Sequence, residues 1–228
     1  NKTKIYENGD KYIGEFINGL KNGKGILYYN KNDEFDRNRY EGCFKDNKRE
    51  GKGILYWNDG DRYEGDFKND KAEGRGIYYF KNGDRYEGDS KEGKSEGRGI
   101  YYYNNGDRYE GEFKNDNKEG KGIYYFNDGD IFEGVFKGEN IEGRGIYYYK
   151  NGDIYKGDIK DNIKEGKGIY FYNEGNIYEG DYKRDNREGR GILYYNNGDR
   201  EMGDYLNGDK IGIHAKLNIN GIVTREVY

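Results

Sequence analysis

The chain has 228 residues, of which 37% are charged and 32% hydrophobic, and 40 basic and 44 acidic side chains give it a net charge of −4. This low hydrophobic content excludes a large multi-layer core, whereas 17% aromatic residues, including 28 tyrosines, are too many for a disordered chain. Basic and acidic residues alternate along the sequence, which argues against the basic surface that nucleic-acid binding requires.

The remaining composition indicates a cytoplasmic protein. No apolar run is long enough to span a membrane, and no signal peptide is recognisable. The single cysteine, Cys43, cannot form an internal disulfide, which favours a reducing compartment. Because the sequence starts at Asn1, we expect it to be a segment of a longer protein.

A unit of 23 residues is repeated along almost the whole chain. Residues 1–11 match the end of such a unit, and we expect them to be the end of a preceding repeat or an N-terminal cap. Residues 12–200 are predicted to form repeats 1–8, with a five-residue insertion near 33–37, and residues 201–228 a degenerate ninth repeat and a C-terminal capping strand. The first position of the eight repeats is held by Tyr12, Tyr40, Tyr63, Tyr86, Tyr109, Phe132, Tyr155 and Tyr178.

Each repeat has the two-residue period of β-strands. In the repeat that begins at Tyr63, aromatic residues and glycine alternate with charged residues over the first strand. A polar loop is predicted over Asn69–Glu73, a second strand over Gly74–Phe80, and a tight two-residue turn at Asn82–Asp84. The predicted fold is therefore all-β: an elongated, single-layer antiparallel meander of about nine tandem β-hairpins, a solenoid-like strip.

The glycines and the first aromatic residues of each repeat are expected to share one face. Rings can then cover bare backbone and offset the weakness of glycine in a strand. Ser90 replaces the phenylalanine of its repeat and predicts a gap in this aromatic row. The positions predicted to have this structural role are Tyr63, Gly65, Phe67, Gly74, Gly76, Tyr109, Gly111 and Phe113.

The opposite face is predicted to bear columns of isoleucine and tyrosine flanked by charges. The glutamate of each Tyr-Glu-Gly triplet lies near basic residues such as Lys52 and Arg75. We expect cross-strand pairing of these charges, which contributes roughly 0.2–1 kcal/mol per pair. The isoleucine and tyrosine columns are an alternative binding site, for a partner or a second copy of the chain.

The last repeat departs most from the pattern. Glu201-Met202-Gly203 replaces Tyr-Glu-Gly, and His214 replaces the second glycine of the Gly-X-Gly motif. Because terminal repeats need an altered surface to close a stack, Met202, Tyr205 and His214 are predicted to form a C-terminal cap.

The motif Tyr-Glu-Gly-X-Phe, followed by Gly-X-Gly and an Asn-Gly-Asp turn, resembles the MORN (membrane occupation and recognition nexus) family. The triplet Tyr-Glu-Gly occurs five times, starting at Tyr40, Tyr63, Tyr86, Tyr109 and Tyr178, and the similarity covers residues 12–214. The resemblance implies a scaffold in a cytoskeletal, cortical or ciliary assembly such as a radial spoke. It also implies phospholipid binding or membrane tethering as an alternative, and homodimerisation through the array ends.

The sequence predicts neither catalysis nor a cofactor. One histidine, His214, and one cysteine, Cys43, are too few for the usual zinc ligands. The carboxylates recur almost equally in every repeat, whereas a catalytic pair needs a distinctive environment. The Gly-X-Gly pairs also lack the strand-to-helix context of a phosphate-binding loop.

We therefore expect a protein-interaction module. Tyrosine is favoured at recognition surfaces because its ring contributes area and its hydroxyl a hydrogen bond. The expected partner is a helix or extended peptide of a cytoskeletal or ciliary protein, with an anionic phospholipid as the alternative. The residues predicted to bind it are Tyr78, Phe80, Tyr101, Tyr103, Tyr124, Phe126, Tyr147, Tyr149, Tyr170 and Tyr172.

Overall fold

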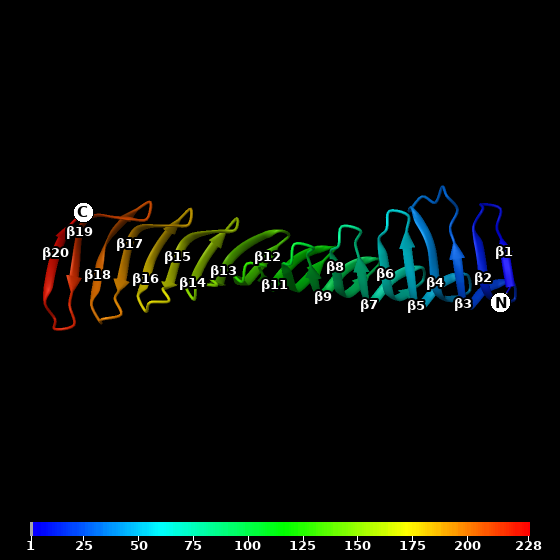
Figure 1. Cartoon of the computed structure of the whole chain (residues 1–228), viewed down its shortest axis with the longest axis horizontal. Helices are drawn as coiled ribbons and strands as arrows, with labels where there is room; N and C mark the ends of the chain where they lie inside the picture. Colours follow the sequence, from blue (N-terminus) through cyan, green and yellow to red (C-terminus); the bar gives the residue numbers. More distant parts are fainter. Residues whose placement is uncertain (1) are drawn as a thin grey trace. The chain divides into compact units, whose positions relative to one another are not determined.

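A computed structural model describes residues 2–228 and consists of antiparallel β-strands that follow one another in chain order (Figure 1). The chain divides into two compact units, Asn1–Asn117 and Lys118–Tyr228. The strands of the first unit are β1 (Lys2–Ile5), β2 (Lys11–Ile17), β3 (Leu20–Tyr28), β4 (Arg37–Lys45), β5 (Lys48–Trp57), β6 (Arg62–Lys68), β7 (Lys71–Tyr79), β8 (Arg85–Lys91), β9 (Lys94–Tyr102) and β10 (Arg108–Lys114).

The second unit continues the same pattern of hairpins, so the predicted all-β antiparallel meander is confirmed. Its strands are β11 (Asn117–Tyr125), which starts at the last residue of the first unit, β12 (Ile131–Lys137), β13 (Asn140–Tyr148), β14 (Ile154–Lys160), β15 (Ile163–Phe171), β16 (Ile177–Lys183), β17 (Asn186–Tyr194), β18 (Arg200–Leu206), β19 (Asp209–Leu217) and β20 (Val223–Val227).

In each hairpin, the tight turn lies where the sequence predicts a longer polar loop. Asn69 and Asp70 join β6 to β7 with φ angles of +48° and +71°, the left-handed values that two-residue hairpin turns require. The prediction of a two-residue turn at Asn82–Asp84 is wrong. There the Phe80 N–H donates to the Asp84 carbonyl at 3.0 Å, which closes a wider loop.

One glycine of each repeat serves backbone geometry and not ring packing. Gly74 has a φ of +84° and lies beside the register shift between Gly65 and Phe67. A side chain there would meet Asp66 and not an aromatic ring. The expectation that Gly74 lies beneath a ring is therefore wrong, and its role is to permit the bulge.

The first aromatic residue of each repeat is the centre of its packing. Tyr63 is fully buried, its hydroxyl donates to the Asp66 carbonyl at 3.1 Å, and its ring meets Phe67 edge-on at 5.2 Å. A Cβ atom on Gly65 or on its cross-strand partner Gly76 would overlap the Tyr63 ring. We call the side of each unit that bears these rings and glycines the glycine face.

Carboxylates connect most hairpins to the next. At one edge, Asp84 Oδ1 accepts the Asn104 N–H at 2.8 Å, and this bond joins the loops of successive repeats. At the other edge, Glu73 Oε2 accepts the Glu92 N–H at 3.1 Å and supports the next tight turn. Both carboxylates satisfy backbone donors that the ladder leaves unpaired, so the repeated acidic residues stabilise the array.

The opposite side, which we call the ion-pair face, bears cross-strand pairs of exposed charges. Lys52 lies 2.8 Å from Asp66, and Lys167 lies 2.5 Å from Asp181. The partner in each pair is the aspartate of the first strand and not the glutamate of the Tyr-Glu-Gly triplet, which corrects the sequence expectation. These pairs are exposed, so each contributes little to stability.

Candidate functional site

A second row of aromatic rings lies on the glycine face of each unit and remains half-buried. In the second unit, the ring centroids of Tyr147 and Tyr149 are 4.5 Å apart, those of Tyr149 and Tyr170 are 5.7 Å apart, and those of Tyr170 and Tyr172 are 4.6 Å apart. The ten predicted binding residues are all half-buried, with Tyr78, Phe80, Tyr101 and Tyr103 in the first unit and Tyr124, Phe126, Tyr147, Tyr149, Tyr170 and Tyr172 in the second.

Loop aspartates orient part of this row. The Tyr170 hydroxyl donates to Asp153 Oδ2 at 2.8 Å, and the Tyr101 hydroxyl donates to Asp84 Oδ2 at 2.9 Å. Burial, together with the neighbouring Asp153 carboxylate, raises the pKa of the Tyr170 hydroxyl. The hydroxyls of Tyr170 and Tyr101 are therefore fixed by the fold, and within the row the ring of Tyr147 stacks on that of Tyr149.

The gap predicted at Ser90 is filled by a neighbouring ring. Tyr78 packs against Tyr63 with 4.4 Å between centroids, and its hydroxyl donates to the Gly93 carbonyl at 3.2 Å. Ser90 itself is buried. Tyr78 therefore combines packing with its position in the second aromatic row.

The four aromatic residues among the predicted structural positions lie in the buried packing of the hairpins. Tyr63, Phe67, Tyr109 and Phe113 are all buried, and their rings meet edge-on within each repeat at 5.2 and 5.3 Å. Gly111 pairs with Gly99 on the neighbouring strand.

Sequence reasoning missed a row of cations on the glycine face. The residue nine positions after the first aromatic residue of a repeat pairs across the hairpin with the residue four positions after it. Phe44 pairs with Arg49, and Tyr182 pairs with Arg187, so both side chains of each pair lie on the glycine face. The sequence does not reveal this row of cations because the position lies in the segment that is predicted to be a polar loop. It is basic at Lys21 and Arg49 in the first unit and at Lys118, Lys164, Arg187 and Lys210 in the second.

Half of these cations are ion-paired within the fold. Arg49 lies 3.4 Å from Asp70, Lys118 lies 2.6 Å from Glu139, and Lys210 lies 2.8 Å from Glu201. Over residues 2–228, the other three have no carboxylate within ion-pair distance: Lys21, Lys164 and Arg187.

Lys164 lies among four rings of the glycine face. Its Nζ is 5.5 to 5.8 Å from the ring centroids, distances at which a cation is attracted to an aromatic face. It is also 3.4 Å from the Tyr149 hydroxyl. Burial lowers the pKa of this ammonium, and the nearby Asp185 opposes that effect only in part. The four rings belong to Tyr149, Tyr155, Tyr170 and Tyr182.

Arg187 is held in the same way one repeat further along. Its guanidinium lies 4.8 Å from the Tyr205 centroid and 5.4 Å from the Tyr178 centroid. One nitrogen, Nη2, donates to the Gly208 carbonyl at 2.8 Å. Lys164 and Arg187 therefore form a neighbouring pair of cations within the aromatic surface.

Two positions exchange their roles in the hairpin formed by β18 and β19. His214 covers Gly203 as the tyrosine ring covers glycine elsewhere, and its Nε2 lies 2.9 Å from the Asp204 carbonyl oxygen, the bond position of the tyrosine hydroxyl. Glu201 is 2% exposed and accepts bonds from Lys210 at 2.8 Å and from Tyr195 at 2.5 Å. Burial alone would raise the pKa of the Glu201 carboxyl, but these donors hold that pKa below its usual range.

The predicted cap residues thus lie in different environments. Tyr205 and His214 are buried, and their ring centroids are 5.4 Å apart. Met202 is 53% exposed. The edge strand β20 is exposed along its length and pairs only with β19 among the described strands.

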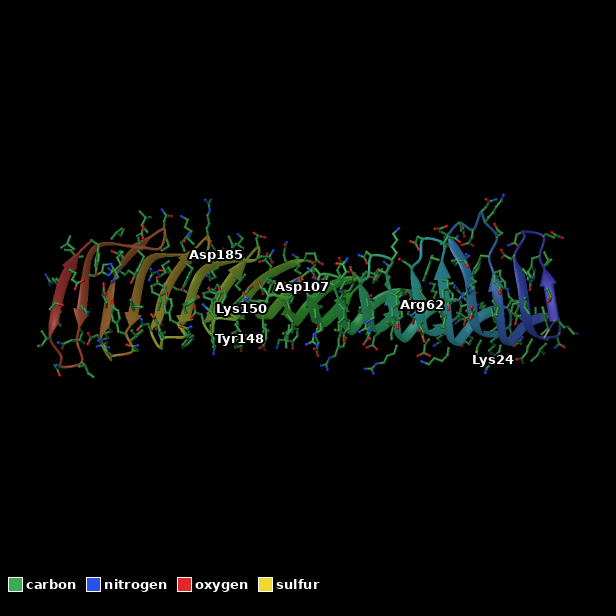
Figure 2. All side chains as sticks on the ribbon, viewed as in Figure 1. Lys24, Arg62, Asp107, Tyr148, Lys150 and Asp185 are labelled. Atoms are coloured by element: carbon green, nitrogen blue, oxygen red, sulfur yellow. The ribbon has the colours of Figure 1, made fainter. Side chains whose placement is uncertain are left out.

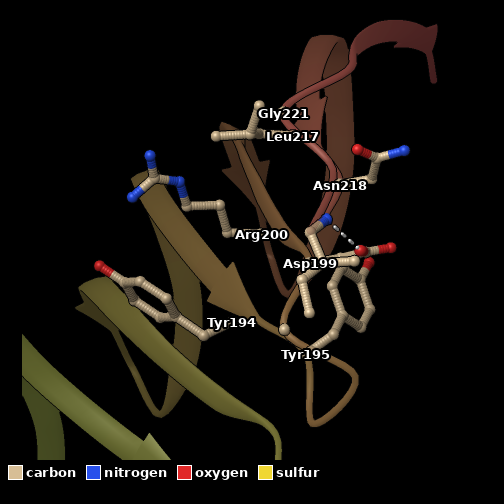
Figure 3. Close-up of a pocket in the computed structure, with 9 residues that line it drawn as sticks. Tyr194, Tyr195, Asp199, Arg200, Leu217, Asn218 and Gly221 are labelled. Atoms are coloured by element: carbon tan, nitrogen blue, oxygen red, sulfur yellow. Dashed lines mark hydrogen bonds between the residues drawn. The ribbon is translucent and has the colours of Figure 1, made fainter.

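A shallow pocket lies between the loops that follow β17 and β19 (Figure 3). Its carboxylate, Asp199, accepts the Ile219 N–H at 3.0 Å and lies 3.8 Å from the Lys216 ammonium, so it serves the loop. Across the described part of the chain, no group of three His, Cys, Asp or Glu residues could hold a metal ion. Within residues 2–228, no helix has the length and apolarity to cross a membrane.

Comparison with known proteins identifies a family for the repeats. The family model described as "MORN repeat" matches eight segments: residues 12–34, 40–62, 63–85, 86–108, 109–131, 132–154, 155–177 and 178–200. No curated protein matches the chain.

Solved structures of similar fold include two of one zebrafish domain. The wild-type TCP10 domain of Danio rerio CPAP, in complex with a peptide of Danio rerio STIL, has a TM-score of 0.51 and 16% identity, covering 78% of this chain and 80% of that one. A second structure of the same domain has a TM-score of 0.51 and 12% identity, covering 99% and 94%. At these identities the similarity concerns the fold alone.

Proposed function

The chain belongs to the MORN repeat family, and we propose that it is a non-catalytic scaffold module that binds a protein partner on its glycine face. The partner presents a helix or an extended peptide, and the setting that we propose is a cytoskeletal or ciliary assembly. The observation that supports this most strongly is the row of half-buried rings, which recurs from repeat to repeat.

Two further features support binding and not catalysis. The histidine is buried inside the β18–β19 hairpin, where its ring covers glycine as tyrosine rings do elsewhere. Carboxylates that recur in most repeats accept backbone N–H groups or form exposed ion pairs. A domain of similar fold, the TCP10 domain of Danio rerio CPAP, has been solved in complex with a peptide, which supports a peptide partner for this chain.

The proposal is tested by truncating rings on one face at a time. Tyr149→Ala with Tyr172→Ala removes two rings from the glycine face, and Tyr148→Ala with Phe171→Ala removes the neighbouring rings from the opposite face. We expect the first pair to weaken partner binding by roughly 30-fold or more, because aromatic residues at the centre of an interface contribute most of its affinity. The second pair is expected to bind as the wild type does.

The measurement is capture of proteins from native lysate on the immobilised chain, followed by mass spectrometry and titration of the captured partner. Circular dichroism of both variants checks that the fold is retained. Equal capture by the two variants would contradict the proposal. So would enrichment of phospholipids without a protein partner.

A further inference from the structure

The two unpaired cations of the second unit have unused hydrogen-bond donors. A lysine ammonium has three donors and a guanidinium has five. The contacts of Lys164 are the Tyr149 hydroxyl at 3.4 Å and the surrounding rings, and those of Arg187 are the Gly208 carbonyl at 2.8 Å and two rings. Partly buried cations gain from an anionic partner, and a planar guanidinium binds a carboxylate through two parallel bonds.

The nearby carboxylates are already engaged by the fold. Asp185 Oδ1 accepts the backbone N–H of Lys164 at 2.8 Å, and its side chain lies at an exposed turn. Glu201 is bound by Lys210 and Tyr195, and Asp153 by Tyr170 and the Asn173 N–H. Lys164 and Arg187 form no ion pair within the described chain, so a carboxylate of another molecule could pair with each of them.

The spacing of the two cations fits an extended peptide. They occupy equivalent positions in successive repeats, two strands apart, which is about 9.6 Å at the usual strand separation. A polyproline II helix has three residues per turn and a rise of about 3.1 Å, so residues three apart face the same side at about 9.3 Å. Aromatic-lined surfaces are the usual docking sites for this conformation.

A flat anionic membrane fits these cations less well than a narrow chain does. Asp161 and Asp185 are exposed at the turns beside the strands that bear Lys164 and Arg187. Figure 2 shows Asp185 at the edge of these turns and Lys150 toward the opposite edge. The two carboxylates would repel an anionic lipid surface at this edge, and the Lys164 ammonium itself lies among rings.

We propose that the partner segment is acidic and extended, and that two of its carboxylates, three residues apart, bind Lys164 and Arg187 while its backbone lies on the adjoining rings. This inference rests on the proposed function, because it specifies the chemistry of the partner that the glycine face binds. It predicts a preference for Glu-X-X-Glu or Asp-X-X-Asp segments without strong helical propensity.

The test uses a fluorescein-labelled peptide of four Glu-Pro-Pro triplets, with fluorescence anisotropy to measure binding. One control peptide has Gln-Pro-Pro triplets, and another has the same composition with its four glutamates adjacent. The binding-face variant is Lys164→Gln with Arg187→Gln. Its matched control is Lys167→Gln with Arg190→Gln, on the same two strands but on the ion-pair face, where they lie 2.5 Å from Asp181 and 4.0 Å from Asp204.

We expect the Glu-Pro-Pro peptide to bind the wild type and the control variant equally. The Lys164→Gln, Arg187→Gln variant should bind it at least about tenfold more weakly, because a hydrogen-bonded charge pair is worth at least that factor. Both control peptides should bind the wild type about tenfold or more weakly than the Glu-Pro-Pro peptide does.

The inference would be overturned if the Glu-Pro-Pro peptide did not bind, or if the Gln-Pro-Pro peptide bound the wild type equally well. It would also be overturned if both charge variants lost the same affinity for the Glu-Pro-Pro peptide. Binding of phosphatidylinositol phosphate vesicles, lost in the Lys164→Gln, Arg187→Gln variant, without peptide binding would assign the cations to a membrane.

The inference and the proposed function can fail separately. If the Lys164→Gln, Arg187→Gln variant captures the cellular partner as the wild type does, while Tyr149→Ala with Tyr172→Ala does not, the acidic-segment inference is wrong and the glycine face remains the binding surface. If neither variant weakens capture, both are wrong.

Discussion

Gly76→Ala is expected to destabilise the first unit by about 3 kcal/mol, whereas Gly74→Ala, two residues earlier in β7, should cost only about 1–2 kcal/mol. The difference follows from what each new methyl group meets. At Gly76 it would overlap the ring and hydroxyl of the fully buried Tyr63, whose neighbours leave it no space to move. At Gly74 it would meet the Asp66 side chain at 3.6 Å, and the cost comes from the left-handed backbone.

The measurement is equilibrium urea unfolding followed by the fluorescence of Trp57, the single tryptophan of the chain, which packs against the core cluster that contains Tyr63. Equal shifts of the unfolding midpoint in the two variants, or a larger shift for Gly74→Ala, would show that ring packing over glycine is not what stabilises the repeat.

The second large effect is expected at the exchanged pair in the β18–β19 hairpin. His214→Gly removes a buried ring and leaves Glu201 without one of its neighbours, which should cost about 3–5 kcal/mol. Glu201→Tyr forces a second ring into the space that His214 occupies, which should cost about 1–3 kcal/mol. The double variant restores the tyrosine-over-glycine arrangement of the other repeats, so we expect it to be more stable than either single variant.

Hydrogen exchange of residues 201–217 measures the local stability of each variant in this double-mutant cycle, because repeat arrays can open one repeat at a time. A coupling free energy of about 2 kcal/mol in favour of the double variant is the expected outcome. If the two single costs simply add, His214 and Glu201 act independently and the exchange of roles is not the basis of the cap.

Much of the fold could be predicted because one short pattern recurs with a fixed period. The alternation around Tyr63 identified strands, and the 23-residue step identified a chain of hairpins. The turns were harder, because both Asn-Asp and Asn-Gly-Asp are typical turn sequences, and pattern alone does not show which one makes the tight turn. Asn69 and Asp70 adopt positive φ angles there although neither is a glycine.

The candidate site was predicted only in part. The aromatic rows recur in most repeats and were therefore visible. The cation position holds Ala72, Ser95 or Ile141 in the other repeats, so it looked like loop variation. Whether Lys164 lacks a carboxylate partner, and whether Lys210 has one, depends on which acidic residues the register brings close. Sequence spacing alone does not give that information.

The most direct test of the account is a tyrosine footprint of the chain with and without its captured protein partner, made by hydroxyl-radical labelling and read by mass spectrometry. Binding on the glycine face predicts that Tyr149 and Tyr172 become protected while Tyr148 and Tyr194, on the opposite face, are labelled as before. Protection of Tyr148 and Tyr194 without protection of Tyr149 and Tyr172 would place the partner on the ion-pair face and contradict the account.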